Sequence, residues 1–267
     1  MTFSSLTSDT KREGRGWLTL EAILPHLFTL LMLLLWWGYA QFVPDYQLPS
    51  PWTVARRITL FVTDPVDMMQ LAASLMHVCV SITLAFAIGC VLAGLAHYVL
   101  ALRLLIDGRL TPFLNAFSGI GWLFIALLWF GLNHVTVIFA VTLILVPFTV
   151  INVRTGLQEL DRDLLELGQS LTRSAFRRVT KIVAPLLLPY LFAALRTSFG
   201  VSWKVVLTAE LFGGNAGVGY LLNQARQEFD TETIFAIIFF IIIFVAAAEI
   251  VLFRPIQRSL NRRFARV

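Results

Sequence analysis

Charged side chains are scarce in this chain of 267 residues, since Asp, Glu, Lys and Arg together make up only 14% of it. A soluble domain carries about 25% charged residues. Hydrophobic residues account for 58% of the chain, and the mean hydropathy is +0.78. Phe occurs 22 times and Trp 7 times, which suits lipid-facing and interfacial positions. The composition predicts an integral membrane protein in contact with lipid.

Cysteine is also scarce, and the two cysteines cannot pair within one helix. Cys79 and Cys90 stand on the same predicted helix, which separates them by about 16 Å at a rise of 1.5 Å per residue. A disulfide needs a much shorter separation. No CxxC or HExxH pattern occurs, and the four histidines are scattered along the chain without metal-ligand spacing, so no metal site is predicted. The histidines are His26, His77, His97 and His134.

Motifs of enzymes and nucleotide-binding proteins are missing as well. The chain has no P-loop and no GxSxG nucleophile motif. Gly217 and Gly219 begin a G-x-G pattern, but Leu222 stands where a dinucleotide site needs a third glycine. We predict no catalytic residue and no cofactor bound by this chain. The pI near 9.6 does not indicate nucleic-acid binding, because the positive charge is spread over short loops and tails.

Six apolar segments have about the 20 residues that a helix needs to cross a bilayer. They are residues 22–43, 74–100, 112–131, 135–151, 186–207 and 233–252. Between and around them we expect an N-terminal tail (1–21), an external loop (44–73) with an interfacial helix over 53–62, a five-span core (74–253) and a basic tail (254–267). The predicted fold is all-α, a polytopic membrane protein with six transmembrane helices.

The distribution of positive charge predicts the orientation. If both termini lie on one side, 16 of the 21 lysines and arginines fall on that side and 3 fall in the opposite loops. The positive-inside rule then makes both termini cytoplasmic. The chain shows no internal repeat of the kind that inverted-repeat transporters carry. We therefore predict a multi-pass membrane protein with both termini in the cytoplasm.

Small residues recur on the second predicted span. Ala85, Gly89 and Ala93 follow one another at intervals of four, as do Cys90 and Gly94. This spacing permits close helix packing in membranes. Ordinary tolerance of glycine in a membrane helix is the alternative.

The longest polar interval of the chain is residues 157–185, between the fourth and fifth spans. Its apolar residues recur at helical spacing and form a narrow stripe. The stripe comprises Leu157, Leu160, Leu164, Leu167, Leu171 and Ala175. Pro185 and Pro189 follow it. We predict an amphipathic cytoplasmic helix with one face toward its own protein and another toward a partner.

The fifth predicted span contains charges at membrane depth, which are costly and often functional. Arg196 and Lys204 differ by about 80° around a helix, so both could border one cavity. They could form a water-filled path for an anionic solute, or else a structural ion pair or snorkelling side chains. Glu210 lies near the outer end of the span.

The polar interval resembles the coupling loop of permease subunits of bacterial ABC importers, the binding-protein-dependent family. The family motif reads E-A-A, three residues, G, nine residues, I-x-L-P. Glu166, Ile182 and Pro185 match it, while Leu167 and Gly168 replace the alanines, Thr172 the glycine and Ala184 the leucine.

Other segments are similar to the sulfonate, taurine and nitrate branch of that family. These segments are Leu48–Val54, Leu127–Leu132, Leu188–Arg196, Trp203–Gly213 and Gly217–Leu222. The similarity covers residues 45–255, nearly the whole chain. It adds Trp203 to Arg196, Lys204 and Glu210 as a candidate for the translocation pathway.

The resemblance implies a mechanism and a set of partners. Two copies of the chain would join two ABC ATPase subunits, which bind ATP and Mg²⁺, and a periplasmic or lipid-anchored binding protein would deliver a small anionic solute. Residues 164–176 would lie in a groove of the ATPase, with Glu166 and Arg173 at the contact. A secondary transporter that works alone and a membrane scaffold that transports nothing are the alternatives.

Overall fold

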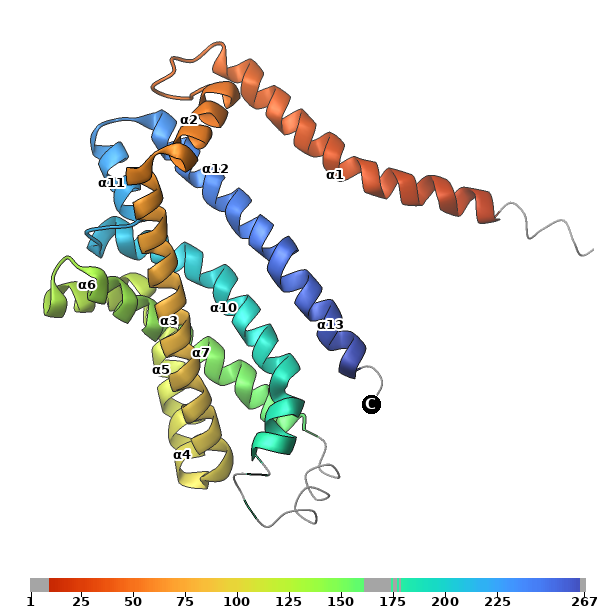
Figure 1. Ribbon diagram of the computed structural model, residues 1–267, viewed down its shortest axis with the longest axis vertical. Coiled ribbons are helices and arrows are strands. Elements are labelled where there is room, and N and C mark those ends of the chain that lie inside the picture. The colour runs from red at the N-terminus through yellow and green to blue at the C-terminus, as the bar shows by residue number, and fades with distance from the viewer. Residues whose placement is uncertain (1–9, 161–173, 175–176, 178, 265–267) are drawn as a thin grey trace, which may run out of the picture.

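The computed structural model describes residues 10–160, 174, 177 and 179–264, and every regular element within them is a helix (Figure 1). The first half of the chain contains α1 (Thr10–Ala40), α2 (Pro51–Thr63), α3 (Pro65–Tyr98), α4 (Leu100–Leu105), the π-helical turn η1 (Ile106–Leu110), α5 (Thr111–Ala116), α6 (Gly119–Phe130) and α7 (His134–Gln158). The second half contains η2 (Val179–Val183), α10 (Ala184–Gly213), α11 (Val218–Gln227), α12 (Thr231–Ala248), η3 (Glu249–Phe253) and α13 (Arg254–Phe264).

Helices α3, α7 and α10 form the centre of the bundle. Helix α12 runs alongside α10 in Figure 1, and its Phe244 packs against Trp203 of α10. The core that these helices share is mostly aliphatic, and Val78, Val141 and Val206 within it are completely buried. Five helices are long and apolar enough to cross a membrane among the described residues. A bent pair adds a sixth if it counts as one span, so the number of six spans stays a prediction.

The small residues of α3 pack against α7. Ala85, Gly89 and Ala93 are buried, and a Cβ added to Gly89 would lie 2.6 Å from Cβ of Thr149. Such an approach needs glycine. A Cβ on Gly94 would meet nothing within 4 Å. The first series of small residues therefore marks a helix contact, as its spacing predicts, whereas Gly94 does not.

The predicted external loop over 44–73 is largely helical. The interfacial helix expected over 53–62 is present as α2, which Ser50 caps with a hydrogen bond from the backbone N–H of Thr53. Asp64 ends α2 and caps α3, accepting from the N–H of Val66 at 2.8 Å. Because of this cap and the proline that follows it, α3 begins nine residues before the predicted span at 74.

The continuous helix expected over 112–131 is broken. Residues 100–116 and 119–130 form two helical arms bent by 84°. Phe117 and Ser118 are extended at the break, and the Phe117 ring lies over Gly121, where a Cβ would come within 2.6 Å of it. The ring also packs edge-on against Trp122 at 4.7 Å between ring centroids. Hydropathy remains high through this corner, so the apolar pattern does not reveal it.

Helix α1 leaves the bundle at an angle (Figure 1). Only 6% of its apolar segment Ile23–Ala40 is buried, so most of its side chains have no neighbour within the described chain. Near its C-terminal end, Trp36 stacks on Phe239 of α12 with 5.0 Å between ring centroids. These contacts attach the end of α1 to α12.

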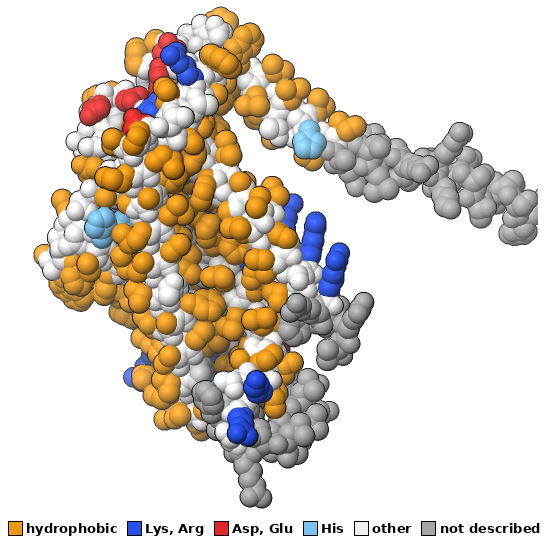
Figure 2. Space-filling view, viewed as in Figure 1, with side chains coloured by type: hydrophobic (Ala, Val, Ile, Leu, Met, Phe, Trp, Pro, Cys, Tyr) orange, Lys and Arg blue, Asp and Glu red, His pale blue; other side chains and the backbone are white. Residues whose placement is uncertain are grey.

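The surface separates into an apolar band and charged ends (Figure 2). Hydrophobic side chains cover the flank of the bundle in this view, acidic residues gather near α2 and α11, and basic residues gather along α13 and at the lower end. Exposed leucine, isoleucine and phenylalanine side chains on α3, α6 and α12 contribute to the band. This arrangement is the one that a bilayer stabilises.

Candidate functional site

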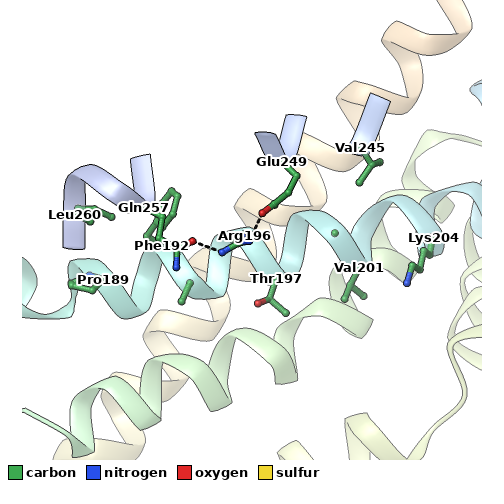
Figure 3. Close-up of a pocket in the computed structure, with 12 residues that line it drawn as sticks. Pro189, Phe192, Arg196, Thr197, Val201, Lys204, Val245, Glu249, Gln257 and Leu260 are labelled. Atoms are coloured by element: carbon green, nitrogen blue, oxygen red, sulfur yellow. Dashed lines mark hydrogen bonds and ion pairs between the residues drawn. The ribbon is translucent and has the colours of Figure 1, made fainter. Parts of the chain in front are cut away.

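A cavity of about 520 Å³ lies between α10 and the α12–α13 pair (Figure 3). Arg196 and Lys204 of α10 both line it, as their angular separation permits. Glu249 of η3 and Gln257 of α13 line the opposite wall. The cavity thus places two basic residues and one acidic residue on the surface of one space.

Arg196 is held by two side chains, one from η3 and one from α13. Its Nη1 donates a hydrogen bond to Oε1 of Gln257, and its Nη2 donates to Oε1 of Glu249. Figure 3 shows both partners pointing toward the guanidinium. The Arg196 and Glu249 side chains are 36% and 29% exposed, so this ion pair lies on the cavity wall and is not sealed from it.

Lys204 lines more of the cavities than any other candidate from the sequence. It lines the cavity of Arg196, an apolar cavity of about 470 Å³ beside α12, and a third of about 340 Å³ between α6, α7 and α10. Its side chain is exposed. Within the described part of the chain, its ammonium makes no hydrogen bond or ion pair.

Trp203 is almost completely buried, with 1% of its surface exposed. Its ring packs against Phe244 of α12 at 5.1 Å between ring centroids, and it lines the apolar cavity together with Lys204 and Leu207. Its Nε1–H has no hydrogen-bond partner among the described residues. Trp203 therefore serves as a wall of that cavity and a packing contact between α10 and α12.

Glu210 differs from the other three candidates because it is fully buried. Its Oε2 accepts hydrogen bonds from Ser74 Oγ at 2.7 Å and from the backbone N–H of Gly219 at 2.8 Å. Its Oε1 lies 2.7 Å from Nδ1 of His77. Glu210 lines none of the cavities described above, and its side chain joins α10 to α3 and α11.

The hydrogen-bonded chain continues from His77 to the surface. Nε2 of His77, which is completely buried, lies 2.8 Å from Nδ1 of His134. His134 is exposed at the first residue of α7. His77 is therefore a packed histidine with a specific acidic partner.

The loop between α10 and α11 is shaped around Glu210. Gly217 has φ of +113°, and a Cβ there would lie 2.3 Å from Cδ of Glu210. The N–H of Gly217 donates to Gln70, and the N–H of Val218 donates to Ser74. A buried carboxylate and two side chains of α3 thus satisfy the first N–H groups of α11.

The two ends of the predicted coupling loop lie close together. The Tyr190 hydroxyl of α10 donates to Glu159 at 2.8 Å, just after α7 ends, and the Tyr190 ring covers Gly156. Leu157 and Leu160, the first two residues of the predicted stripe, are buried against Leu187.

Some predicted coupling residues lie in the described part of the chain. Ile182 is half-buried in η2, and Pro185 is exposed in the first turn of α10. The others lie outside the described residues: Glu166, Leu167, Gly168, Thr172 and Arg173, with Leu164, Leu171 and Ala175 of the stripe.

Sequence reasoning missed Glu249, Gln257 and Ser74. Glu249 carries a recognisable signal, because it is the single acidic residue in the apolar stretch between Ile234 and Phe253. Gln257 and Ser74 carry none, since an uncharged polar residue in a helix has many harmless explanations. Only the folded chain brings Ser74 and Glu210, 136 residues apart, into contact.

The comparison with known families agrees with these features. The family described as "Binding-protein-dependent transport system inner membrane component" matches residues 22–266. The chain belongs to this family. The permease is therefore a transport subunit of the inner membrane and not an enzyme.

Three relatives illustrate the branch in which the permease falls. It is 29% identical over 233 residues to the bicarbonate transport system permease protein CmpB of Synechocystis sp. strain PCC 6803, covering 81% of this chain and 82% of the relative. It is 25% identical over 242 residues to the taurine permease protein TauC of Escherichia coli K12, covering 86% of each. It is 33% identical over 110 residues to the aliphatic sulfonates permease protein SsuC of Bacillus subtilis strain 168, covering 41% of this chain and 40% of the relative.

Proposed function

We propose that the permease forms the translocation pathway of an ATP-driven importer for a small anionic solute. Support comes from the family, whose transport depends on binding proteins, and from the names of its relatives, whose solutes are bicarbonate, taurine and aliphatic sulfonates. Each of these solutes carries one anionic group. The observation that carries the proposal for this chain is the cavity lined by Arg196 and Lys204.

The pathway runs along α10 in this proposal. Lys204 attracts the solute, because a cation in an apolar setting interacts strongly with an anion. Trp203 contributes the apolar wall beside it. Glu210 acts indirectly, by holding α11 against α3 and α10.

The partners follow the organisation of the family. Two copies of the permease associate with two ATPase subunits, which bind ATP and Mg²⁺, and a binding protein delivers the solute. Both termini lie in the cytoplasm. Residues 157–185 carry the ATPase contact, with Glu166 and Arg173 central to it.

The coupling works as alternating access in this proposal. ATP binding draws the ATPases together, and residues 157–185 transmit the movement to α7 and α10. The hydrogen bond between Tyr190 and Glu159 supports this role, since it links the two helices that the loop connects. The ATPases bias a two-state equilibrium of the permease through differential binding.

Co-purification and uptake together test the proposal. The tagged permease, expressed with its native neighbouring genes, is expected to retain a P-loop ATPase in equal amount. Glu166→Lys is expected to abolish uptake and to reduce ATPase recovery, while Arg258→Gln, an exposed charge removal on α13, leaves both unchanged. Solute movement in liposomes without ATP by the permease alone would show a secondary transporter. An ATPase complex without any solute uptake would show a scaffold.

A further inference from the structure

The cavity between α10 and the α12–α13 pair is lined by an ion pair in which Glu249 offsets the positive charge of Arg196. We propose that Glu249 is the internal counter-ion of Arg196, so that Lys204 is the one uncompensated charge among the described residues of the lining and the cavity accepts monoanions in preference to dianions. The inference rests on the proposed function, because it specifies the solute class for that same cavity.

Charge counting within the cavity is the first step. Among the described residues, the charged side chains that line it are Arg196, Lys204 and Glu249, which gives this part of the lining a net charge of +1. A charge removed from water is costly unless a partner compensates it. One monoanion neutralises this lining, whereas a dianion leaves one negative charge uncompensated in a largely apolar space.

The geometry assigns different roles to the two cations. The Nη1 and Nη2 groups of Arg196 are engaged by Gln257 and Glu249. Lys204 stands eight residues further along α10, a separation of about 12 Å. Its ammonium has three donors, and none of them contacts another side chain among the described residues. A solute therefore finds all three donors free at Lys204, whereas two of the five N–H donors of Arg196 are engaged and its charge is paired with Glu249.

The position of Glu249 distinguishes it from a purely structural partner. The ion pair is partly exposed on the cavity wall, so the carboxylate of Glu249 faces the same space as Lys204. Glu249 is also the first residue of the π-helical turn η3, and such turns are frequent at functional sites. Glu249 thus determines how much positive charge the solute meets.

Anion binding to the purified full-length chain in nanodiscs tests this inference. Ethanesulfonate and sulfate are titrated at constant ionic strength, and their dissociation constants are measured by calorimetry. The unaltered chain is expected to bind ethanesulfonate the more tightly. Lys204→Gln is expected to weaken ethanesulfonate binding about tenfold or more. Glu249→Gln is expected to change the ratio of the two dissociation constants by about tenfold in favour of sulfate.

Matched variants separate the local charge from the total charge. Arg258→Gln and Glu228→Gln change the total charge by the same amounts at exposed residues outside the cavity, and neither should alter the ratio. The double variant Arg196→Glu with Glu249→Arg keeps the ion pair and the net charge, so it should retain the original preference. An unchanged ratio in Glu249→Gln, or unchanged ethanesulfonate binding in Lys204→Gln, overturns the inference.

Uptake by the complete import system distinguishes this failure from failure of the proposed function. Uptake of some solute with no effect of Glu249→Gln on the binding ratio refutes the monoanion inference alone. No ATP-dependent uptake of any solute, with the expected shifts in binding, refutes the importer and leaves an anion site.

Discussion

The carboxylate of Glu210 accepts the backbone N–H of Gly219 at 2.8 Å, across the loop that joins α10 to α11. The same carboxylate contacts Ser74 and His77 of α3. One side chain therefore joins three helices, with no exposed surface of its own. The stability of this end of the bundle should depend on its charge and its acceptor capacity.

Glu210→Gln should destabilise the permease by about 1 to 3 kcal/mol, because the amide replaces an acceptor oxygen with a donor and leaves a buried group unsatisfied. Thermal unfolding in detergent measures the effect. Glu228→Gln makes the same change at an exposed residue and should be neutral. Equal melting temperatures for the two variants would contradict the assigned network.

Gly217→Ala should destabilise by about 1 to 3 kcal/mol, since a positive φ strains any residue with a side chain. The added Cβ would also overlap the Glu210 carboxylate. Gly94→Ala is the control, because a Cβ there meets nothing within 4 Å. It should be neutral or stabilising by up to about 1 kcal/mol, as alanine suits a helix interior better than glycine. The same unfolding assay ranks the two variants, and the reverse order would exclude this loop geometry.

Arg57→Gln should weaken the contact between α2, α3 and α12. Arg57 pairs with Asp67 at 3.1 Å and donates to Thr233 at 2.9 Å. Asp67 is 6% exposed, so losing its partner should cost about 1.5 to 3 kcal/mol. The neighbouring exposed Arg56 supplies the control Arg56→Gln. Chemical denaturation that gives the same midpoint for both variants would refute this role of Arg57.

Gly89→Val should separate α3 from α7 at their closest approach. Thr149 leaves no room for a branched side chain, so overpacking should cost about 1 to 3 kcal/mol. Gly94→Val, on the same helix without a near neighbour, should cost less. Expression level and melting temperature in detergent provide the comparison, and a larger loss for Gly94→Val would place the contact face elsewhere.

The sequence predicts the helices better than it predicts their contacts. Apolar runs and helix caps are local, so the helices at α3, α7 and α10 follow from hydropathy, and Gly89 follows from its spacing. Hydropathy does not predict the corner at Phe117, because it reports how apolar a segment is and not where the helix bends. The packing of the Phe117 ring over Gly121 exists only in the folded structure.

The candidate site was predicted unevenly for the same reason. Arg196 and Lys204 were found because a charge in an apolar span is conspicuous. The sequence identifies Glu210 as a candidate, but its burial depends on Ser74 and His77 of α3 and on Gly219 of α11, which only the folded chain brings to it. The pairing of Arg196 with Glu249 could not be predicted, because it depends on how the last helical segments pack against α10.

Helix α10 is continuous from Ala184 to Gly213. Its 30 residues make a rod about 45 Å long. One end adjoins the segment that we expect to contact the ATPase, and the other end carries Glu210 and the glycine loop. The α4–α6 segment can absorb a displacement at its 84° corner, but a rod has no such joint. A displacement of α10 at Tyr190 is therefore expected to move the helix as one body as far as Glu210, and Arg196 and Lys204 move with it.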